Sequence, residues 1–183
     1  MVWIIVLVVV VLLVLLVIGA YNGLVRGRNQ VDNAWSQIDV QLKRRLDLIP
    51  NLVETVKGYA AHEKTTLEAV VNARNAGIAA PATPAGQAAA DNQITGALRQ
   101  LFALSESYPD LKANQSYLAL QEELSATEGR IAYARQFYND GVLSFNTKIQ
   151  QFPASIVAKR KGYTQTEYFR AEEAAREVPK VQF

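Results

Sequence analysis

The side chains of this sequence that could do acid–base or metal chemistry are one histidine and a few scattered carboxylates. His62 and Glu63 begin the pattern of a helical zinc protease, in which a second histidine follows four residues after the first. Thr66 occupies the position of that second histidine, and the chain contains 1 histidine in all. We therefore interpret His62 as a surface or hydrogen-bonded residue, and we expect no metal and no cofactor.

The carboxylates also lack the spacing of a catalytic pair. Asp47 and Glu54 share a helical face because they lie 7 residues apart. A rise of ~1.5 Å per residue separates them by about 10 Å, which is too far for an acid–base pair. We favour ion pairing on one helix surface with the basic residues nearby, which are Lys43, Arg44, Arg45 and Lys57.

Composition excludes several further classes of function. The chain has no cysteine, which rules out disulfides, thiolate metal sites and cysteine nucleophiles. Lysine and arginine number 19 against 17 acidic residues, and the net charge of +2 is too small for a nucleic-acid binder. We therefore expect no nucleic-acid partner. Because the sequence offers no convergent polar site, we also expect a protein that is not an enzyme and has no small-molecule substrate.

An unbroken apolar run occupies residues 2–20. At ~1.5 Å rise per residue, a helix of this length covers roughly the 30 Å hydrocarbon core of a bilayer. The sequence therefore predicts a transmembrane anchor over residues 1–21. The alternative is a cleaved secretory signal ending near Ala20. We favour the anchor because the run exceeds the usual ~7 to 15 apolar residues of a signal and no basic residue precedes it.

The basic residues that follow the run predict its orientation. Arg26 and Arg28 lie directly after the apolar run, and nothing basic comes before it. The positive-inside rule then places the N-terminus outside and the rest of the chain in the cytoplasm.

After the anchor, apolar residues recur at three- and four-residue spacing from Val31 to Val70, which predicts one amphipathic helical spine reaching about residue 77. Pro50 is the helix breaker in this stretch. Because the apolar register passes through it without a shift, we expect a kink. A tight helical hairpin at residues 47–51 is the alternative.

The remaining chain predicts further helices. Residues 77–92 are rich in alanine, proline and glycine and are interpreted as a loop. A second helix is expected over 93–108, and a third, capped by Asn114, up to about residue 152. The third carries apolar residues every seven positions, which are Tyr117, Leu124, Ile131, Tyr138, Phe145 and Phe152.

The C-terminal part contains weaker helix signals. A short helix is expected over 155–160, closed by Gly162. Thr164 and Glu167 form a capping-box pattern that predicts another helix. Residues 178–183 are expected to form an extended tail, because Pro179 prevents a helix from continuing.

No segment shows the alternation of a strand. The predicted fold is all-α, with an N-terminal transmembrane helix followed by an antiparallel up-and-down bundle of about four helices in one domain over residues 22–183.

Two long segments resemble the LemA family of bacterial membrane proteins. They are AWSQIDVQLKRRLDLIPNLVETVKGYAAHEKTTL, residues 34–67, and LFALSESYPDLKANQSYLALQEELSATEGRIAYAR, residues 101–135. The likeness continues to the closing PKVQF. It implies a helical bundle on one N-terminal anchor in the bacterial inner membrane, and a link to building internal membranes through a relative in magnetosome-forming bacteria. It brings no catalytic residue with it. Gly129 departs from the family, which more often places asparagine there.

The basic residues are the candidate contact sites with lipid heads or protein partners. They are Arg26, Arg28, Lys43, Arg44, Arg45, Lys57, Lys159, Arg160 and Lys161. Our leading hypothesis is a non-enzymatic membrane-anchored scaffold that self-associates as a coiled-coil-like homo-oligomer and organises the membrane. The alternative is an adaptor that docks another membrane protein, such as a protease or sensor.

Overall fold

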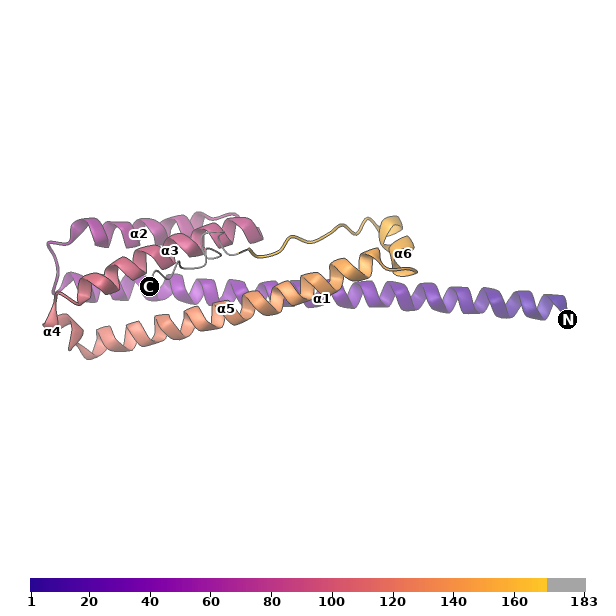
Figure 1. Ribbon diagram of the computed structural model, residues 1–183, viewed down its shortest axis with the longest axis horizontal. Helices are drawn as coiled ribbons and strands as arrows, with labels where there is room; N and C mark the ends of the chain where they lie inside the picture. Colours follow the sequence, from indigo (N-terminus) through magenta and orange to yellow (C-terminus); the bar gives the residue numbers. More distant parts are fainter. Residues whose placement is uncertain (171–183) are drawn as a thin grey trace, which may run out of the picture. The chain divides into compact units, whose positions relative to one another are not determined.

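The computed structural model describes residues 1–170, and within that range it contains helices and connecting loops but no strand. This confirms the all-α prediction. The helices are α1 (Val2–Lys57), α2 (Lys64–Ala79), α3 (Pro84–Ser105), α4 (Pro109–Lys112), α5 (Gln115–Gln150) and α6 (Ala154–Lys161) (Figure 1).

The chain forms two compact units. Unit 1 comprises residues 1–37 and 134–168, and unit 2 comprises residues 38–133 and, at the end of the described chain, residues 169–170. Both units draw on the range 22–183, for which the sequence predicted a single bundle domain. Helix α1 contributes its first part to unit 1 and its last part to unit 2. The first part of α5 belongs to unit 2 and its last part to unit 1.

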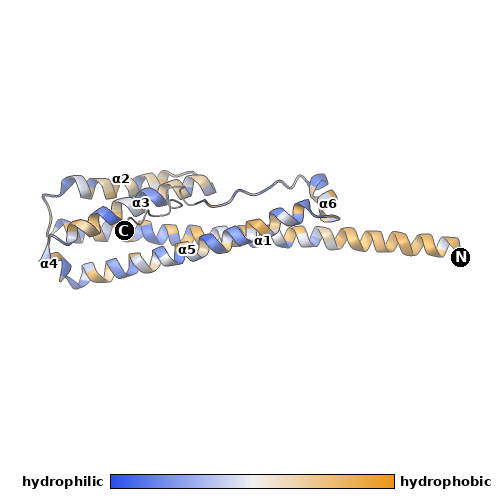
Figure 2. Cartoon of the chain, viewed as in Figure 1, coloured by the Kyte–Doolittle hydropathy of each residue, from blue (hydrophilic) through white to orange (hydrophobic). Residues whose placement is uncertain are grey.

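The first part of α1 is the apolar segment. The large apolar side chains of residues 2–18 are all exposed, and Figure 2 shows this end of α1 as the longest hydrophobic stretch of the chain. Among the described residues, α1 is the one helix that is long and apolar enough to cross a membrane. The structure thus agrees with an N-terminal transmembrane helix.

Helix α1 continues through Pro50 to Lys57, so the alternative of a hairpin at residues 47–51 is wrong. A proline inside a helix leaves the carbonyl four residues earlier without its donor. Here that carbonyl belongs to Leu46, and Arg74 Nε from α2 donates a hydrogen bond to it at 3.1 Å. A side chain of a neighbouring helix therefore supplies the hydrogen bond that Pro50 cannot make.

The predicted spine to residue 77 is wrong, because the chain turns between α1 and α2. Gly58 follows the last residue of α1, and Ala60 is buried in the turn. The amide of Ala60 donates to the Val56 carbonyl at 2.8 Å, and the amide of Glu63 donates to the Ala60 carbonyl at 3.1 Å. The apolar spacing runs on across this turn because α1 and α2 both bury one face in the same core.

Unit 2 is an up-and-down arrangement of α1, α2, α3 and α5, with the single turn α4 between α3 and α5 (Figure 1). Each helix places apolar side chains at helical spacing into one core, which is the arrangement expected for antiparallel bundles. The core members include Ile49, Leu52, Val56, Leu67, Val70, Ile94, Leu98, Leu101, Leu111, Tyr117 and Leu124.

The predicted loop over 77–92 is also wrong, since only residues 80–83 connect α2 to α3. Thr83 caps α3 by accepting a hydrogen bond from the Gly86 amide at 3.2 Å, and Pro84 occupies the first turn, where a proline loses no helical hydrogen bond. Gly77 lies inside α2, and an added Cβ would meet Leu46 Cδ2 at 2.9 Å. The small residues of this stretch allow close helix packing.

Helix α5 confirms the predicted third helix and its cap. The Asn114 side chain accepts a hydrogen bond from the Tyr117 amide at 3.0 Å. The residues seven apart are buried as far as Phe145. Phe152 is 79% exposed because it lies beyond the end of α5.

Helix α6 and its Gly162 cap, with φ 74°, confirm the predicted short helix. The helix expected from Thr164 is wrong over residues 163–170, which are not helical. Asn146 of α5 donates to the Thr166 carbonyl at 2.9 Å and accepts from the Thr166 amide at 2.8 Å. These bonds occupy the backbone groups that a helix would use. The predicted tail over 178–183 lies outside the described residues.

Two glycines give a matched prediction for stability. A Cβ at Gly129 of α5 meets nothing within 4 Å, so G129A is expected to raise the free energy of unfolding by about 0.5 to 1 kcal/mol. G162A should instead destabilise the protein, because Gly162 has a positive φ that alanine disfavours. Thermal unfolding of the full chain in detergent, followed by circular dichroism, checks both directions. A lower midpoint for G129A would contradict the expectation.

Candidate functional site

A buried ion pair lies in the interior of unit 2. Arg45 of α1 is 2% exposed, and its Nη1 lies 2.7 Å from Asp91 Oδ1 of α3. Asp91 is 4% exposed. Glu128 of α5 approaches Arg45 Nη2 at 3.8 Å from the surface. One guanidinium thus links three helices of the unit.

This geometry corrects the prediction for Arg45. A side chain that is buried and paired cannot contact lipid heads or a partner surface, so that expectation is wrong. The spacing of Arg45 relative to two apolar residues could have indicated its burial from the sequence. Arg45 lies 3 residues after Leu42 and 4 before Ile49, and both of those residues are buried. The helical period therefore places Arg45 on the buried face, although it belongs to a run of three basic residues.

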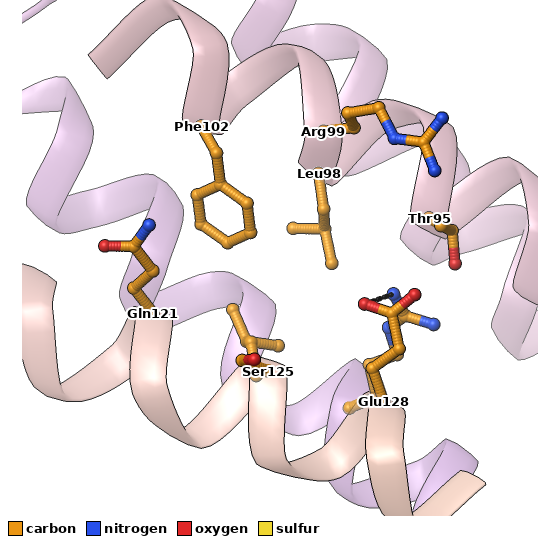
Figure 3. A pocket seen from close by; sticks show the side chains of 9 residues that line it. Thr95, Leu98, Arg99, Phe102, Gln121, Ser125 and Glu128 are labelled. Atoms are coloured by element: carbon orange, nitrogen blue, oxygen red, sulfur yellow. Dashed lines mark ion pairs between the residues drawn. The ribbon is translucent and has the colours of Figure 1, made fainter. Parts of the chain in front are cut away.

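A pocket of about 260 Å³ opens beside the ion pair (Figure 3). Leu98 and Phe102 of α3 lie opposite Gln121 and Ser125 of α5 (Figure 3). The carboxylate of Glu128 points toward the guanidinium of Arg45, to which the dashed line runs. Small-molecule sites usually occupy about 300 to 1,000 Å³, so this pocket is smaller than most. We interpret the cluster as a structural connection between helices.

The other predicted contact residues of unit 2 lie on its surface. Lys43 is exposed, and Arg44 forms an ion pair with Glu123 of α5. Lys57 borders a shallow pocket of about 340 Å³ together with residues of α2. The ion pairs of Arg44 and Arg45 reach other helices, so the predicted pairing within α1 does not describe them. Contact of Lys43, Arg44 or Lys57 with lipid or a partner stays a prediction.

Three tyrosine hydroxyls, those of Tyr108, Tyr117 and Tyr138, donate hydrogen bonds. Tyr108 donates to Glu63 Oε1 at 2.9 Å, and this bond raises the pKa of Tyr108. Burial raises the pKa of Tyr117, which donates to Ser105 Oγ at 2.7 Å. Burial also raises the pKa of Tyr138, which donates to the Glu167 carbonyl at 2.9 Å. Glu63, the acid of the zinc-protease-like pattern, therefore has a structural partner.

No three His, Cys, Asp or Glu side chains among residues 1–170 gather closely enough to hold a metal ion.

Unit 1 brings the other predicted basic residues to the end of the apolar segment. Arg26 and Arg28 follow that segment on α1 and are exposed, and Arg28 pairs with Asp32 at 3.1 Å. Lys159, Arg160 and Lys161 form the last turn of α6. Lys161 Nζ lies 5.6 Å from the centre of the Tyr21 ring, within the range of a cation–π contact.

Helix α6 has a defined position within unit 1. Ala154 and Ala158 are buried, and the ring of Tyr163 packs edge-on against Phe145 of α5, with centroids 5.9 Å apart. Lys148 of α5 also donates to the Gly23 carbonyl of α1 at 3.3 Å. These contacts hold the basic last turn of α6 beside Tyr21, which directly follows the apolar run of α1.

Comparison with known proteins gives the same family as the sequence motifs. The sequence model of the LemA family matches residues 34–183. Protein LemA of Metamycoplasma hominis is 33% identical over 162 residues, which cover 87% of this chain and 73% of that protein.

Proteins named for the magnetosome are similar as well. Magnetosome protein MamQ 2 of Paramagnetospirillum magneticum is 26% identical over 179 residues, covering 84% of this chain and 66% of its own length. Magnetosome protein MamQ of Magnetospirillum gryphiswaldense matches with the same identity and coverage. The chain therefore spans slightly less than two thirds of these magnetosome proteins. With a family match over most of its length and a relative at 33% identity, this chain belongs to the LemA family.

Proposed function

We propose that this protein is a non-enzymatic, membrane-anchored helical scaffold that self-associates and organises the membrane around it. The observation that carries the proposal is the continuity of helix α1. It is a single helix from Val2 to Lys57, so the same element that offers a membrane span also supplies buried residues to unit 2, among them Ile49 and Leu52.

Unit 2 has exposed apolar side chains that a self-association surface could use. Val40, Ile78 and Tyr133 are 61%, 58% and 72% exposed. Single apolar side chains are common on protein surfaces, and contact with a second copy would cover them. The relatives named as magnetosome proteins fit a role in organising a membrane. The self-association surface itself is part of the proposal.

The proposed orientation places the N-terminus outside and the chain from residue 22 onward in the cytoplasm of a bacterial inner membrane. Arg26 and Arg28, which are exposed directly after the apolar segment, support it through the positive-inside rule. The chain has no cysteine, so a single S125C variant can be labelled cleanly. Labelling of Cys-substituted Ser125 by an impermeant reagent added to intact cells would contradict this orientation.

The mass of the full chain in nanodiscs and in mild detergent tests the scaffold. We expect a discrete oligomer by light scattering and electron microscopy, stable on dilution. A variant in which residues 2–18 are replaced by a polyleucine helix of equal length is the control for association through the span. A monomer at every concentration would overturn self-association, and the adaptor function would then be tested by identifying a co-purifying membrane protein.

A further inference from the structure

We propose that unit 1 binds one anionic phospholipid in a groove between the end of the membrane span and α6. This inference rests on the proposed membrane anchoring and adds a ligand to it. The groove has a volume of about 530 Å³, within the range of about 300 to 1,000 Å³ that is usual for ligand sites.

The two walls of the groove differ in polarity. Val17 and Ile18 of α1 and Val157 of α6 give it an apolar side. Arg160 and Lys161 of α6 lie at the same groove and carry positive charge. An apolar wall beside two cations matches a molecule with an acyl chain and a phosphate, and both belong to a phospholipid.

The groove also lies at the right depth for a lipid. Val17 and Ile18 belong to the apolar run, and Tyr21 lies directly after it. Tyrosine is enriched at the boundary between hydrocarbon and headgroups. When α1 spans a bilayer, the apolar wall is therefore level with acyl chains, and the cations near Tyr21 are level with phosphates.

Helix α6 has the character of an interfacial helix. Phe152, two residues before its start, and Ile156 are 79% and 60% exposed, and three basic residues form its last turn. Large apolar side chains combined with lysine and arginine are typical of helices that lie in the membrane surface. The exposed side chains of Phe152 and Ile156 can therefore insert into the bilayer beside the bound lipid.

Basic residues in a last turn also stabilise a helix through its dipole, so the charges alone do not identify a lipid site. A lipid site also needs an apolar groove for the acyl chain. The shape of this groove can be changed by mutation while its positive charge is kept. V157W should fill the groove and retain every cation. R160Q/K161Q should remove the phosphate contacts and leave the groove open.

The experiment is native mass spectrometry of the full chain released from nanodiscs that contain phosphatidylglycerol and phosphatidylcholine. We expect one phosphatidylglycerol retained per chain. R160Q/K161Q should bind it about 30-fold more weakly, which corresponds to about 2 kcal/mol at 1.4 kcal/mol per tenfold change. V157W should lose it as well. K64Q/R99Q, which removes two exposed charges of unit 2, is the charge-matched control and should retain it.

Three results would overturn the proposal. They are equal retention of phosphatidylcholine, full retention by V157W, and a loss in K64Q/R99Q as large as that in R160Q/K161Q. Circular dichroism of each variant shows whether it is folded, and R160K/K161R is a conservative pair that should retain the lipid. A wild-type chain that enters nanodiscs but retains no lipid would overturn the lipid site alone. A chain that does not enter nanodiscs would overturn the membrane anchoring itself.

Discussion

Replacing Asp91 with alanine is expected to lower the free energy of unfolding by about 3 to 5 kcal/mol, because Arg45 would stay buried without its counterion. The pair is short, at 2.7 Å, and both residues are almost completely buried. Glu128 lies 3.8 Å from the guanidinium, and its side chain is 57% exposed, so it compensates only weakly. Chemical unfolding of the full chain in detergent, followed by circular dichroism, measures the loss.

Two control variants separate the buried charge from other effects. D32A removes the aspartate of the exposed pair with Arg28, and surface pairs of this kind contribute about 0 to 1 kcal/mol. The double variant R45M/D91L replaces both charges with apolar side chains and should recover most of the loss. A D91A variant that is no less stable than D32A would contradict the structural function of the pair.

Truncating Leu52 to alanine is the second change with a large expected effect. Leu52 follows Pro50 by 2 residues on α1 and is 0% exposed in the core of unit 2. Removing a buried leucine side chain to its Cβ costs about 2 to 5 kcal/mol, because apolar contact is lost and a cavity remains. The denaturant midpoint of the full chain should fall accordingly.

L118A is the matched control for this truncation. Leu118 of α5 is 46% exposed, so the same chemical change should alter stability far less. Comparable effects of L52A and L118A would show that the segment of α1 after Pro50 does not pack in the core.

Periodicity in the sequence predicted the long helices well. Tyr117, Leu124, Ile131, Tyr138 and Phe145 are buried as their spacing indicated, because a helix that packs along its whole length places a residue on the same face about every two turns. Local chemistry likewise predicted Asn114 as a cap and Gly162 as a helix end. Such features depend on residues a few positions apart.

The errors arose where distant residues decide the local structure. The alanine- and glycine-rich residues 77–92 looked like a linker, yet most of them are helical, and Gly77 lets α2 approach Leu46 closely. Thr164 had the pattern of a cap, but Asn146 binds the nearby backbone instead. Arg45 belonged to a charged run, and its partner Asp91 lies 46 residues away. No spacing rule along one helix contains that information.

The hydrogen bond from Arg74 to the Leu46 carbonyl has a consequence for the order of biosynthesis. The two residues are separated by 28 positions. The segment around Pro50 has therefore already been synthesised and has entered the ribosomal exit tunnel when Arg74 is added to the chain. Until α2 emerges and packs, the Leu46 carbonyl must find water as its donor. The apolar segment at the N-terminus precedes Pro50, so it leaves the ribosome before the Leu46 carbonyl can gain this donor.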